Sequence, residues 1–120
     1  MRIVGSDNVE LTLRLAGVDA PERDQPYGNT ATGALEAIVR DEHLTLVDTG
    51  RDKYGRVLAN CFIGNEWIEL ELVQQGFAWA YPEFAEAELV GAENKARAAG
   101  EGLWAADSPI PPWKWRKGER

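Results

Sequence analysis

The sequence predicts an α+β domain, in which strands come first along the chain and helices then pack against them. Apolar and polar residues alternate over residues 10–15, apolar residues recur at helical spacing over residues 85–99, and turn residues separate the periodic segments. At 120 residues the chain is long enough for one domain and one core. We expect residues 1–108 to form that domain and residues 109–120 to form a Pro- and Trp-rich tail packed on it.

Four segments carry strand patterns. Residues 10–15 place three leucines on one face and Arg14 on the other, which predicts a half-buried strand. Residues 1–4 are apolar enough to pair with it across a polar turn. Residues 43–48 predict a third strand and residues 57–63 a fourth, which is apolar on both faces, as expected where a helix covers a sheet.

Three segments carry helical patterns, and a glycine follows each of the last two. Residues 29–40 predict the first helix, with Asn29 or Thr30 expected to cap its start. Residues 68–75 predict a short second helix, and residues 85–99 predict the longest one. Together with the four strands, these helices complete the expected α+β layout.

The net charge is −7, with 20 acidic residues against 13 lysines and arginines. This balance argues against a protein that binds nucleic acid through a broad basic face, but it allows an enzyme that holds phosphate through a few arginines and a cation. The sequence shows no apolar stretch of bilayer-spanning length and no signal-peptide core at its start. We therefore expect a cytoplasmic protein by default, and a secreted or periplasmic one if a leader has been removed.

The lone cysteine and the lone histidine have structural interpretations. Cys61 cannot form an intramolecular disulfide, and its apolar surroundings predict a buried, inert thiol. His43 opens a predicted strand, where a surface or strand-capping role is expected rather than catalysis.

Two segments carry residues suited to chemistry. In the first, Arg14, Asp19 and Glu22 follow one another at the end of a strand and in the loop after it. Strict alternation would place Arg14 and Asp19 on opposite faces, so a bend at residues 16–17, where a glycine stands, is needed to bring them together. The second segment is Asp-Lys-Tyr-Gly-Arg at residues 52–56, in the turn between the third and fourth predicted strands.

These residue types suit phosphodiester hydrolysis. The reaction needs a cation to polarise the phosphate, a carboxylate to take a proton from water, and donors for the charge that grows on the phosphate oxygens. Guanidinium groups match phosphate oxygens two at a time, and carboxylate oxygens suit Ca²⁺ or Mg²⁺. Either segment alone would also fit charged residues that are simply solvated at strand ends.

Together the two segments resemble the two signatures of staphylococcal-nuclease-like (thermonuclease) proteins. The resemblance continues, in the right order, over nearly the whole chain. Its further parts are Gln25-Pro26-Tyr27-Gly28, the segment from Leu72 to Trp79, the segment from Glu93 to Arg97, Gly102-Leu103-Trp104, and the closing Pro112-Trp113-Lys114-Trp115-Arg116. The resemblance implies an OB-fold β-barrel with about three helices packed on it.

The resemblance also implies a Ca²⁺-dependent endonuclease that hydrolyses DNA and RNA and leaves 3′-phosphates. Asp19 corresponds to a calcium ligand through its carboxylate, and Ala20 to one through its backbone carbonyl. Glu22 corresponds to the general base, or to the residue that orients the attacking water. Arg14 and Arg56 correspond to the pair that clamps the phosphate and stabilises the transition state.

Substrate contacts are implied for three further residues. Lys53 and Tyr54 would contact a terminal phosphate of the nucleic acid, and Tyr81 would lie under a base. In the tail, Trp113 and Trp115 alternate with basic residues. We expect them to hold an extended tail on the domain, with stacking on bases as the alternative.

The sequence departs from the family pattern at its start. Family members carry Asp-Gly-Asp-Thr upstream of the strand that leads to the arginine, and residues 1–4 here match the segment just after it. We therefore expect the first barrel strand and its acid to be missing, and Asp7 to lie on the wrong side to replace that acid. A calcium site with one carboxylate fewer should bind more weakly. The open sheet edge could be covered in a homodimer or by a longer native chain.

Two functions follow from the sequence. The first is a metal-dependent nuclease, weakened if the upstream acid is absent; the intact Arg14, Glu22 and Arg56 favour it. The alternative is a catalytically inactive OB module that binds nucleic acid or protein, favoured by the negative charge and the missing acid.

Overall fold

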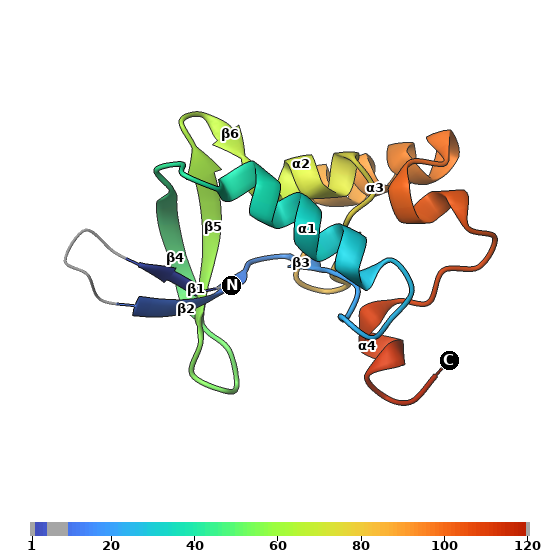
Figure 1. Cartoon of the computed structure of the whole chain (residues 1–120), viewed down its shortest axis with the longest axis horizontal. Coiled ribbons are helices and arrows are strands. Elements are labelled where there is room, and N and C mark those ends of the chain that lie inside the picture. The colour runs from blue at the N-terminus through green and yellow to red at the C-terminus, as the bar shows by residue number, and fades with distance from the viewer. Residues whose placement is uncertain (1, 5–9, 120) are drawn as a thin grey trace.

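A twisted β-sheet lies at one end of the molecule, and most of the helices gather at the other (Figure 1). The computed structural model describes the backbone of residues 2–4 and 10–119 and the side chains from residue 12 to residue 119. The predicted α+β class is confirmed, although the described strands form two open sheets and do not close into a barrel. Asp7 lies outside the described residues.

The larger sheet is built around one long central strand. This strand, β5 (Val57–Ile63), pairs in parallel with β2 (Glu10–Leu15) and antiparallel with β4 (Thr45–Arg51). The first strand, β1 (Arg2–Val4), pairs antiparallel with β2, as predicted. The two-residue β6 (Glu66–Trp67) folds back onto β5 after a tight turn.

The strand predicted at residues 43–48 begins and ends later than expected. It runs from Thr45 to Arg51, and its register with β5 shifts between Asp48 and Gly50. This register shift is a β-bulge, in which the Gly50 N–H donates to Asp48 Oδ1 at 2.8 Å. The bulge allows the polar residues 48–50 to remain part of the strand. His43 lies exposed before the strand, as the surface interpretation predicted.

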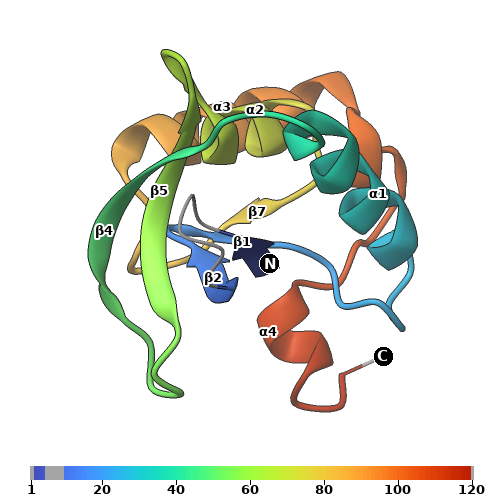
Figure 2. The same cartoon turned by 60° about the vertical axis from the view of Figure 1, so that its left-hand side comes forward.

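A second, two-stranded sheet crosses the space between the larger sheet and the helices (Figure 2). It consists of β3 (Val18–Asp19) and β7 (Trp79–Ala80), which run antiparallel. Strands of two residues are too short to show a periodic pattern, which is why the sequence did not predict them. All four residues are buried, so this small sheet places the first motif at the core.

The three predicted helices are present, with ends within two residues of those expected. They are α1 (Gly28–Val39), α2 (Ile68–Gln74) and α3 (Ala87–Ala99), and they lie together on one side of the molecule (Figure 2). Two short elements were not predicted: a 3₁₀ turn, η1 (Gly102–Ala105), and a four-residue helix, α4 (Pro112–Trp115). Among the described residues, no helix has the length and apolarity that crossing a bilayer requires.

The start of α1 differs from the prediction. The N-cap residue is Tyr27, at φ 73°, and its side chain makes no capping hydrogen bond, so the expected cap at Asn29 or Thr30 is wrong. A Cβ at Gly28 would lie 1.8 Å from the Glu22 carbonyl oxygen. The close packing of Gly28 on the preceding loop, rather than a side-chain cap, therefore sets where the helix begins.

Two clusters of buried residues form the interior. The first lies between β5, α2 and α3 and contains Val18, Cys61, Ile68, Leu72, Val73, Ala78, Ala80, Leu89 and Ala92. The second joins α3 to the C-terminal part and contains Trp79, Ala96, Leu103 and Trp104. Cys61 is a free thiol in the first cluster, and burial raises its pKa to about 11, in accord with the predicted inert thiol.

Two glycines, Gly76 and Gly102, allow the chain after α2 to contact the chain after α3 closely. A Cβ at Gly76 would lie 2.2 Å from the Glu101 carbonyl oxygen, and a Cβ at Gly102 would lie 2.4 Å from that of Gly76. The Leu103 N–H donates to the Gly76 carbonyl at 2.9 Å. Only glycines allow this approach, which fixes η1, and the chain after it, against the end of α2.

Candidate active site

The first motif turns from the larger sheet into the small one. Arg14 lies near the end of β2, and the chain bends at residues 16–17, with Gly17 at φ 76°. The Gly17 carbonyl accepts a hydrogen bond of 2.9 Å from the Tyr81 N–H, which holds the bend against the chain after β7. As a result Arg14 Nη2 lies 3.5 Å from Asp19 Oδ1. The bend that the alternation argument required is present.

A buried carboxylate and a half-exposed one follow this bend. Asp19 is 3% exposed at the end of β3, and Glu22 follows it across the buried Pro21. The Glu22 N–H donates to Gln25 Oε1 at 3.0 Å, and the Gln25 side chain in turn donates to the Ile110 carbonyl. The loop that carries both acids is therefore fixed to the C-terminal part of the chain.

A third residue, from the end of the chain, joins these two acids. Arg116 donates to both carboxylate oxygens of Asp19, through Nη1 to Oδ1 at 3.2 Å and through Nη2 to Oδ2 at 2.7 Å. Its Nη1 also donates to Glu22 Oε1 at 2.6 Å. These hydrogen bonds, to Asp19 first and then to Glu22, raise the pKa of Arg116 further above its ordinary value. We call Arg14, Asp19, Glu22 and Arg116 the acid–arginine cluster.

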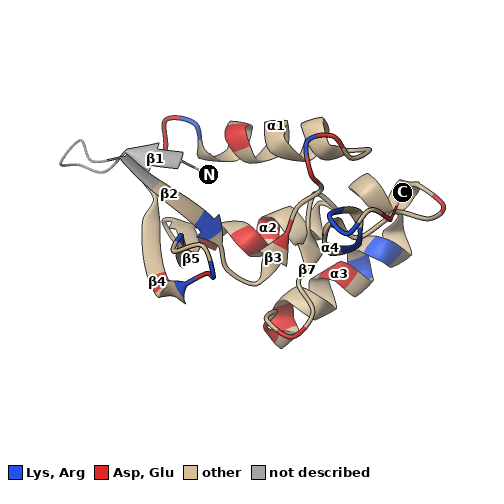
Figure 3. Ribbon diagram, turned by 90° about the horizontal axis from the view of Figure 1, so that it is seen from below, with Lys and Arg blue, Asp and Glu red and all other residues tan. Residues whose placement is uncertain are grey.

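The basic residues of α4 and the turn after it lie beside β3, where Asp19 stands (Figure 3). The sequence did not assign Arg116 a role. The signal was present, because Trp113 and Arg116 are three residues apart and share a face of one helical turn. The expectation of an extended tail concealed it, and that expectation is wrong for residues 112–115, which form α4 with Pro112 at its first position.

Tyr81 lies at the edge of the cluster, and three side chains contact its ring. The Arg14 guanidinium carbon is 5.6 Å from the ring centroid. The Trp113 ring stacks on it with centroids 5.5 Å apart and planes 13° apart, and Phe84 meets it edge-on at 5.4 Å. Trp113 also packs edge-on against Trp79 at 5.5 Å. Trp113 thus holds α4 against the small sheet and covers Tyr81.

The second motif forms the tip of the hairpin between β4 and β5. Asp52 accepts hydrogen bonds from the Tyr54 and Arg56 N–H groups at 2.9 and 2.8 Å, and Arg56 Nε lies 2.5 Å from its carboxylate. Burial alone would raise the pKa of Asp52, but these hydrogen bonds outweigh it and lower the pKa below its ordinary value. Tyr54 is 73% exposed, and Lys53 Nζ lies 5.2 Å from its ring centroid. Lys53 and Tyr54 therefore stand at the exposed tip.

Strand register relates this hairpin to the first motif. Arg14 is opposite Leu58 in the parallel β2–β5 pair, and Arg56 precedes Leu58 by two residues. Arg56 lies one residue before β5, and the side-chain alternation of β5, extended back by that residue, puts Arg56 on the same face as Arg14. The ion-pair partner of Arg56 is Asp52 rather than Asp19 or Glu22, and the pair uses Nε, leaving Nη1 and Nη2 out of it. The structure thus joins Arg14 to Asp19 directly, and Asp19 to Glu22 through Arg116, while Arg56 pairs with Asp52.

The oxygen donors in the cluster fit a hard cation. The Asp19 and Glu22 carboxylates both reach one guanidinium nitrogen of Arg116, at 3.2 and 2.6 Å, so both face one position that already holds positive charge. Ca²⁺ and Mg²⁺ prefer such carboxylate oxygens, with water or substrate phosphate completing the shell. Over the described part of the chain, no group of three or more His, Cys, Asp or Glu side chains could hold a metal by itself. The two acids and the Ala20 carbonyl would thus supply only part of a coordination shell.

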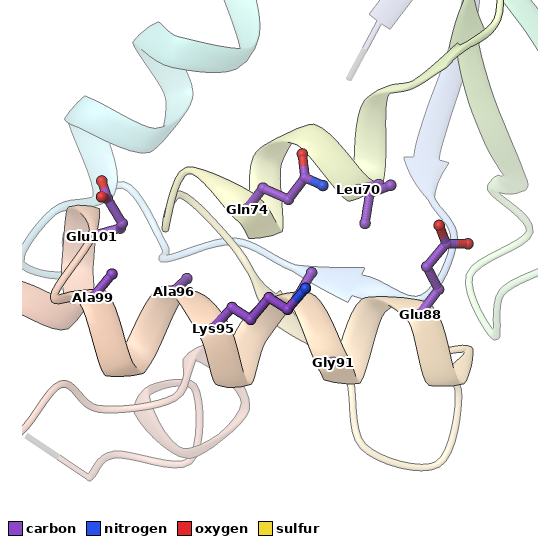
Figure 4. A pocket seen from close by; sticks show the side chains of 9 residues that line it. Leu70, Gln74, Glu88, Gly91, Lys95, Ala96, Ala99 and Glu101 are labelled. Carbon is purple, nitrogen blue, oxygen red and sulfur yellow. The ribbon is translucent and has the colours of Figure 1, made fainter.

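A groove on the helical side contains none of these residues. It lies between α2 and α3, has a volume of about 440 Å³, and is lined by small and charged side chains such as Gly91, Ala96, Glu88 and Lys95 (Figure 4). A second hollow of about 460 Å³ lies under the C-terminal segment, with Pro21 and Trp115 in its wall. The acid–arginine cluster, rather than either hollow, carries the chemistry-bearing side chains.

Comparisons with known proteins cover most of the chain. The sequence model of the family described as "Staphylococcal nuclease homologue" matches residues 12–106, which include both motifs. An "Uncharacterized endonuclease" of Haemophilus influenzae is 38% identical over 114 residues, which cover 94% of this chain and 64% of that protein. "Staphylococcal-like nuclease CAN1" of Arabidopsis thaliana is 36% identical over 109 residues, which cover 90% of this chain and 34% of that protein.

An "Uncharacterized endonuclease" of Escherichia coli is 31% identical over 125 aligned residues, which cover 97% of this chain and 82% of that protein. The chain thus spans less than two thirds of the length of the Haemophilus and Arabidopsis proteins. The resemblance predicted from the two motifs is confirmed over nearly the whole chain. This chain belongs to the staphylococcal nuclease homologue family.

Proposed function

We propose that this chain is a metal-dependent nuclease that hydrolyses phosphodiester bonds of DNA or RNA. The observation that carries the proposal is the arrangement of the first motif, in which Arg14 contacts Asp19 and one arginine, Arg116, reaches both Asp19 and Glu22. Arg56, on the same sheet face as Arg14, adds a second guanidinium. The relatives named as endonucleases and nucleases support the same reaction class.

The side chains have distinct roles in this proposal. Asp19 and the Ala20 carbonyl would hold Ca²⁺, which when bound supplies positive charge next to the phosphate. Arg14 and Arg56 would hold the phosphate and stabilise the charge on its equatorial oxygens in the transition state. Glu22 would accept a proton from water as the water oxygen bonds to phosphorus. The bond to the leaving oxygen then breaks, that oxygen takes a proton from solvent, and one water is consumed.

Substrate contacts come from the hairpin tip and from Tyr81. Lys53 and Tyr54 are exposed where the end of a nucleic-acid strand could reach them, and we propose that they contact a terminal phosphate. Tyr81 would stack against a base, which requires Trp113 to leave its ring. We further infer that the larger sheet is an OB-type barrel in open form, and that a homodimer covers its free edge.

The proposed nuclease activity is tested by cleavage of a fluorophore–quencher DNA strand and its RNA counterpart, with Ca²⁺ and with a chelator. We expect chelator-sensitive cleavage that falls at least about a hundredfold in Glu22→Gln, because the variant lacks the proton acceptor. Glu36→Gln is the matched control, since Glu36 is exposed on α1, away from both motifs. Equal cleavage by Glu22→Gln and wild type would refute the assigned base.

A second candidate function is a catalytically inactive module that binds nucleic acid or protein. The observation that favours it is Arg116, which already occupies the acids that a nuclease needs for metal and water. Cleavage absent under every condition, together with oligonucleotide binding by fluorescence anisotropy, would support this function over the first.

A further inference from the structure

We propose that Arg116 is an internal cation of the site, which neutralises Asp19 and Glu22 in the metal-free protein and is displaced when a divalent cation binds. The proposal rests on the proposed metal-dependent function. It adds a residue from the C-terminal segment to the site, and it makes that segment a cover that opens as metal enters. We call residues 111–119 the C-terminal cover.

The contacts of Arg116 have the form of a built site. Its guanidinium engages both oxygens of Asp19 in a two-pronged contact and reaches Glu22 with the same nitrogen that meets Oδ1. Two-pronged arginine–carboxylate contacts fix orientation as well as charge. Arg116 therefore covers both proposed metal-side acids at once.

Burial explains why the acids need a cation. Asp19 is 3% exposed, and a buried carboxylate without a partner would be strongly unfavourable in the folded protein. Arg14 contributes, but its Nη2 is 3.5 Å from Asp19, whereas Arg116 Nη2 is 2.7 Å away. Arg116 is thus the nearer counter-charge to Asp19.

A bound metal would compete for the same oxygens. Ca²⁺ lies about 2.3–2.6 Å from its carboxylate ligands, and Arg116 Nη2 lies 2.7 Å from Asp19 Oδ2. A cation bound to that oxygen would therefore sit within about 5 Å of the guanidinium, where like charges repel strongly in a partly buried site. Occupancy by one disfavours occupancy by the other.

The C-terminal cover is the part of the site that can leave. Its helix has four residues, and the Arg116 side chain is 39% exposed. The cover is also attached through the buried Pro112, through Trp113, which packs on Tyr81 and on the buried Trp79, and through a hydrogen bond of 3.2 Å from Trp115 Nε1 to Asp24. Arg14, by contrast, is part of a sheet strand. Departure of the cover would also uncover the Tyr81 ring.

Calorimetric titration with Ca²⁺ tests the proposal without any measurement of activity. The variants are Arg116→Gln and the matched control Lys117→Gln, which removes the same charge from the next residue, also exposed. We expect Arg116→Gln to bind Ca²⁺ at least about tenfold more tightly than wild type, and Lys117→Gln to stay within about twofold. Unchanged or weaker binding by Arg116→Gln overturns the proposal.

Hydrogen exchange on the wild-type protein gives a second readout that needs no variant. Six amides of the cover, those of residues 114–119, donate to carbonyls of residues 111–115. We expect Ca²⁺ to speed their exchange as the cover leaves, while the β2–β5 amides keep their protection. If Ca²⁺ binds and the exchange of these amides does not become faster, the proposed opening of the cover is wrong, whereas the proposed metal site is supported. Absence of Ca²⁺ binding to all three proteins refutes the metal site, and the proposal with it.

Discussion

Two arginines contact the same buried carboxylate from opposite ends of the chain, and they are held in very different ways. Arg14 is five residues from Asp19 and lies on β2, whose neighbours Leu13 and Leu15 are in register with β5. Arg116 is 97 residues from Asp19 and follows a four-residue helix. The more distant residue in sequence makes the shorter contact, 2.7 Å against 3.5 Å.

The difference indicates separate roles for the two guanidinium groups. A group on a central strand keeps its position whatever binds, which suits the stabilisation of a transition state. A partly exposed group after a single helical turn can exchange with a ligand without breaking a strand ladder. Arg14 is accordingly assigned to the reaction, and Arg116 to the metal-free form.

Changing each arginine to lysine is the most direct test of whether Arg14 and Arg116 have different roles. We expect Arg14→Lys to lower kcat at saturating Ca²⁺ on the order of a thousandfold, since lysine cannot hold two phosphate oxygens in one plane. Arg116→Lys should change kcat less than about tenfold, because the group has left the site. Initial rates on the fluorophore–quencher strand measure both. Equal losses would mean that the two arginines share one role.

Glu69 shows what a buried carboxylate does without an arginine. It is fully buried and accepts hydrogen bonds from the Cys61 N–H at 3.0 Å and from Trp67 Nε1 at 2.7 Å. Burial raises its pKa to about 7, although these hydrogen bonds act in the opposite direction. Between pH 4.5 and about 7, the folded protein thus keeps a proton on Glu69 that the unfolded chain has lost.

The pH dependence of stability follows from this shift. The contribution of Glu69 should be fully present below the unfolded-chain pKa of 4.5 and should be lost as pH rises through about 7. The loss is on the order of 3 kcal/mol in the free energy of unfolding. Urea titrations between pH 4.5 and 8 should show a free energy of unfolding that falls as the pH rises in wild type and in the control Glu36→Gln. The fall should be absent in Glu69→Gln. The same slope in Glu69→Gln would contradict the assignment.

Trp113 connects the C-terminal cover to Tyr81 and to the small sheet. Its removal should therefore loosen the cover and leave Asp19 and Glu22 unchanged. We expect Trp113→Ala to lower the free energy of unfolding by about 1–2 kcal/mol, through loss of its contacts with Tyr81 and Trp79. It should also tighten Ca²⁺ binding, by less than Arg116→Gln does. Urea titration and calorimetry measure the two effects. Weaker Ca²⁺ binding in a folded Trp113→Ala would count against the cover.

The smallest effect is expected at the exposed hairpin tip. Tyr54→Ala should raise KM for a 5′-phosphorylated strand about threefold and leave kcat nearly unchanged, since Tyr54 contacts only the proposed terminal phosphate. A strand without that phosphate is the control and should show no difference. A fall in kcat would place Tyr54 with the reacting groups instead.

Local patterns were enough to predict most elements and the first motif. The alternation in residues 10–15 and the apolar runs of β5, α2 and α3 specify their elements because neighbouring residues decide periodicity. The need for a bend at Gly17 also followed from side-chain alternation, and the bend is present. The sequence did not predict the two-residue strands, the bulge in β4 or the start of α1. Close packing with distant segments defines each of these features.

Residue types and their spacing along the chain predicted which groups could act on a phosphate: Arg14, Asp19, Glu22 and Arg56. They could not show that Arg116 sits on the two acids, because that contact requires the chain to close a loop of nearly a hundred residues. The Gly76–Gly102 contact and the stacking of Trp113 on Tyr81 direct the C-terminal segment back to β3. Such contacts depend on shapes that exist only after the core has packed.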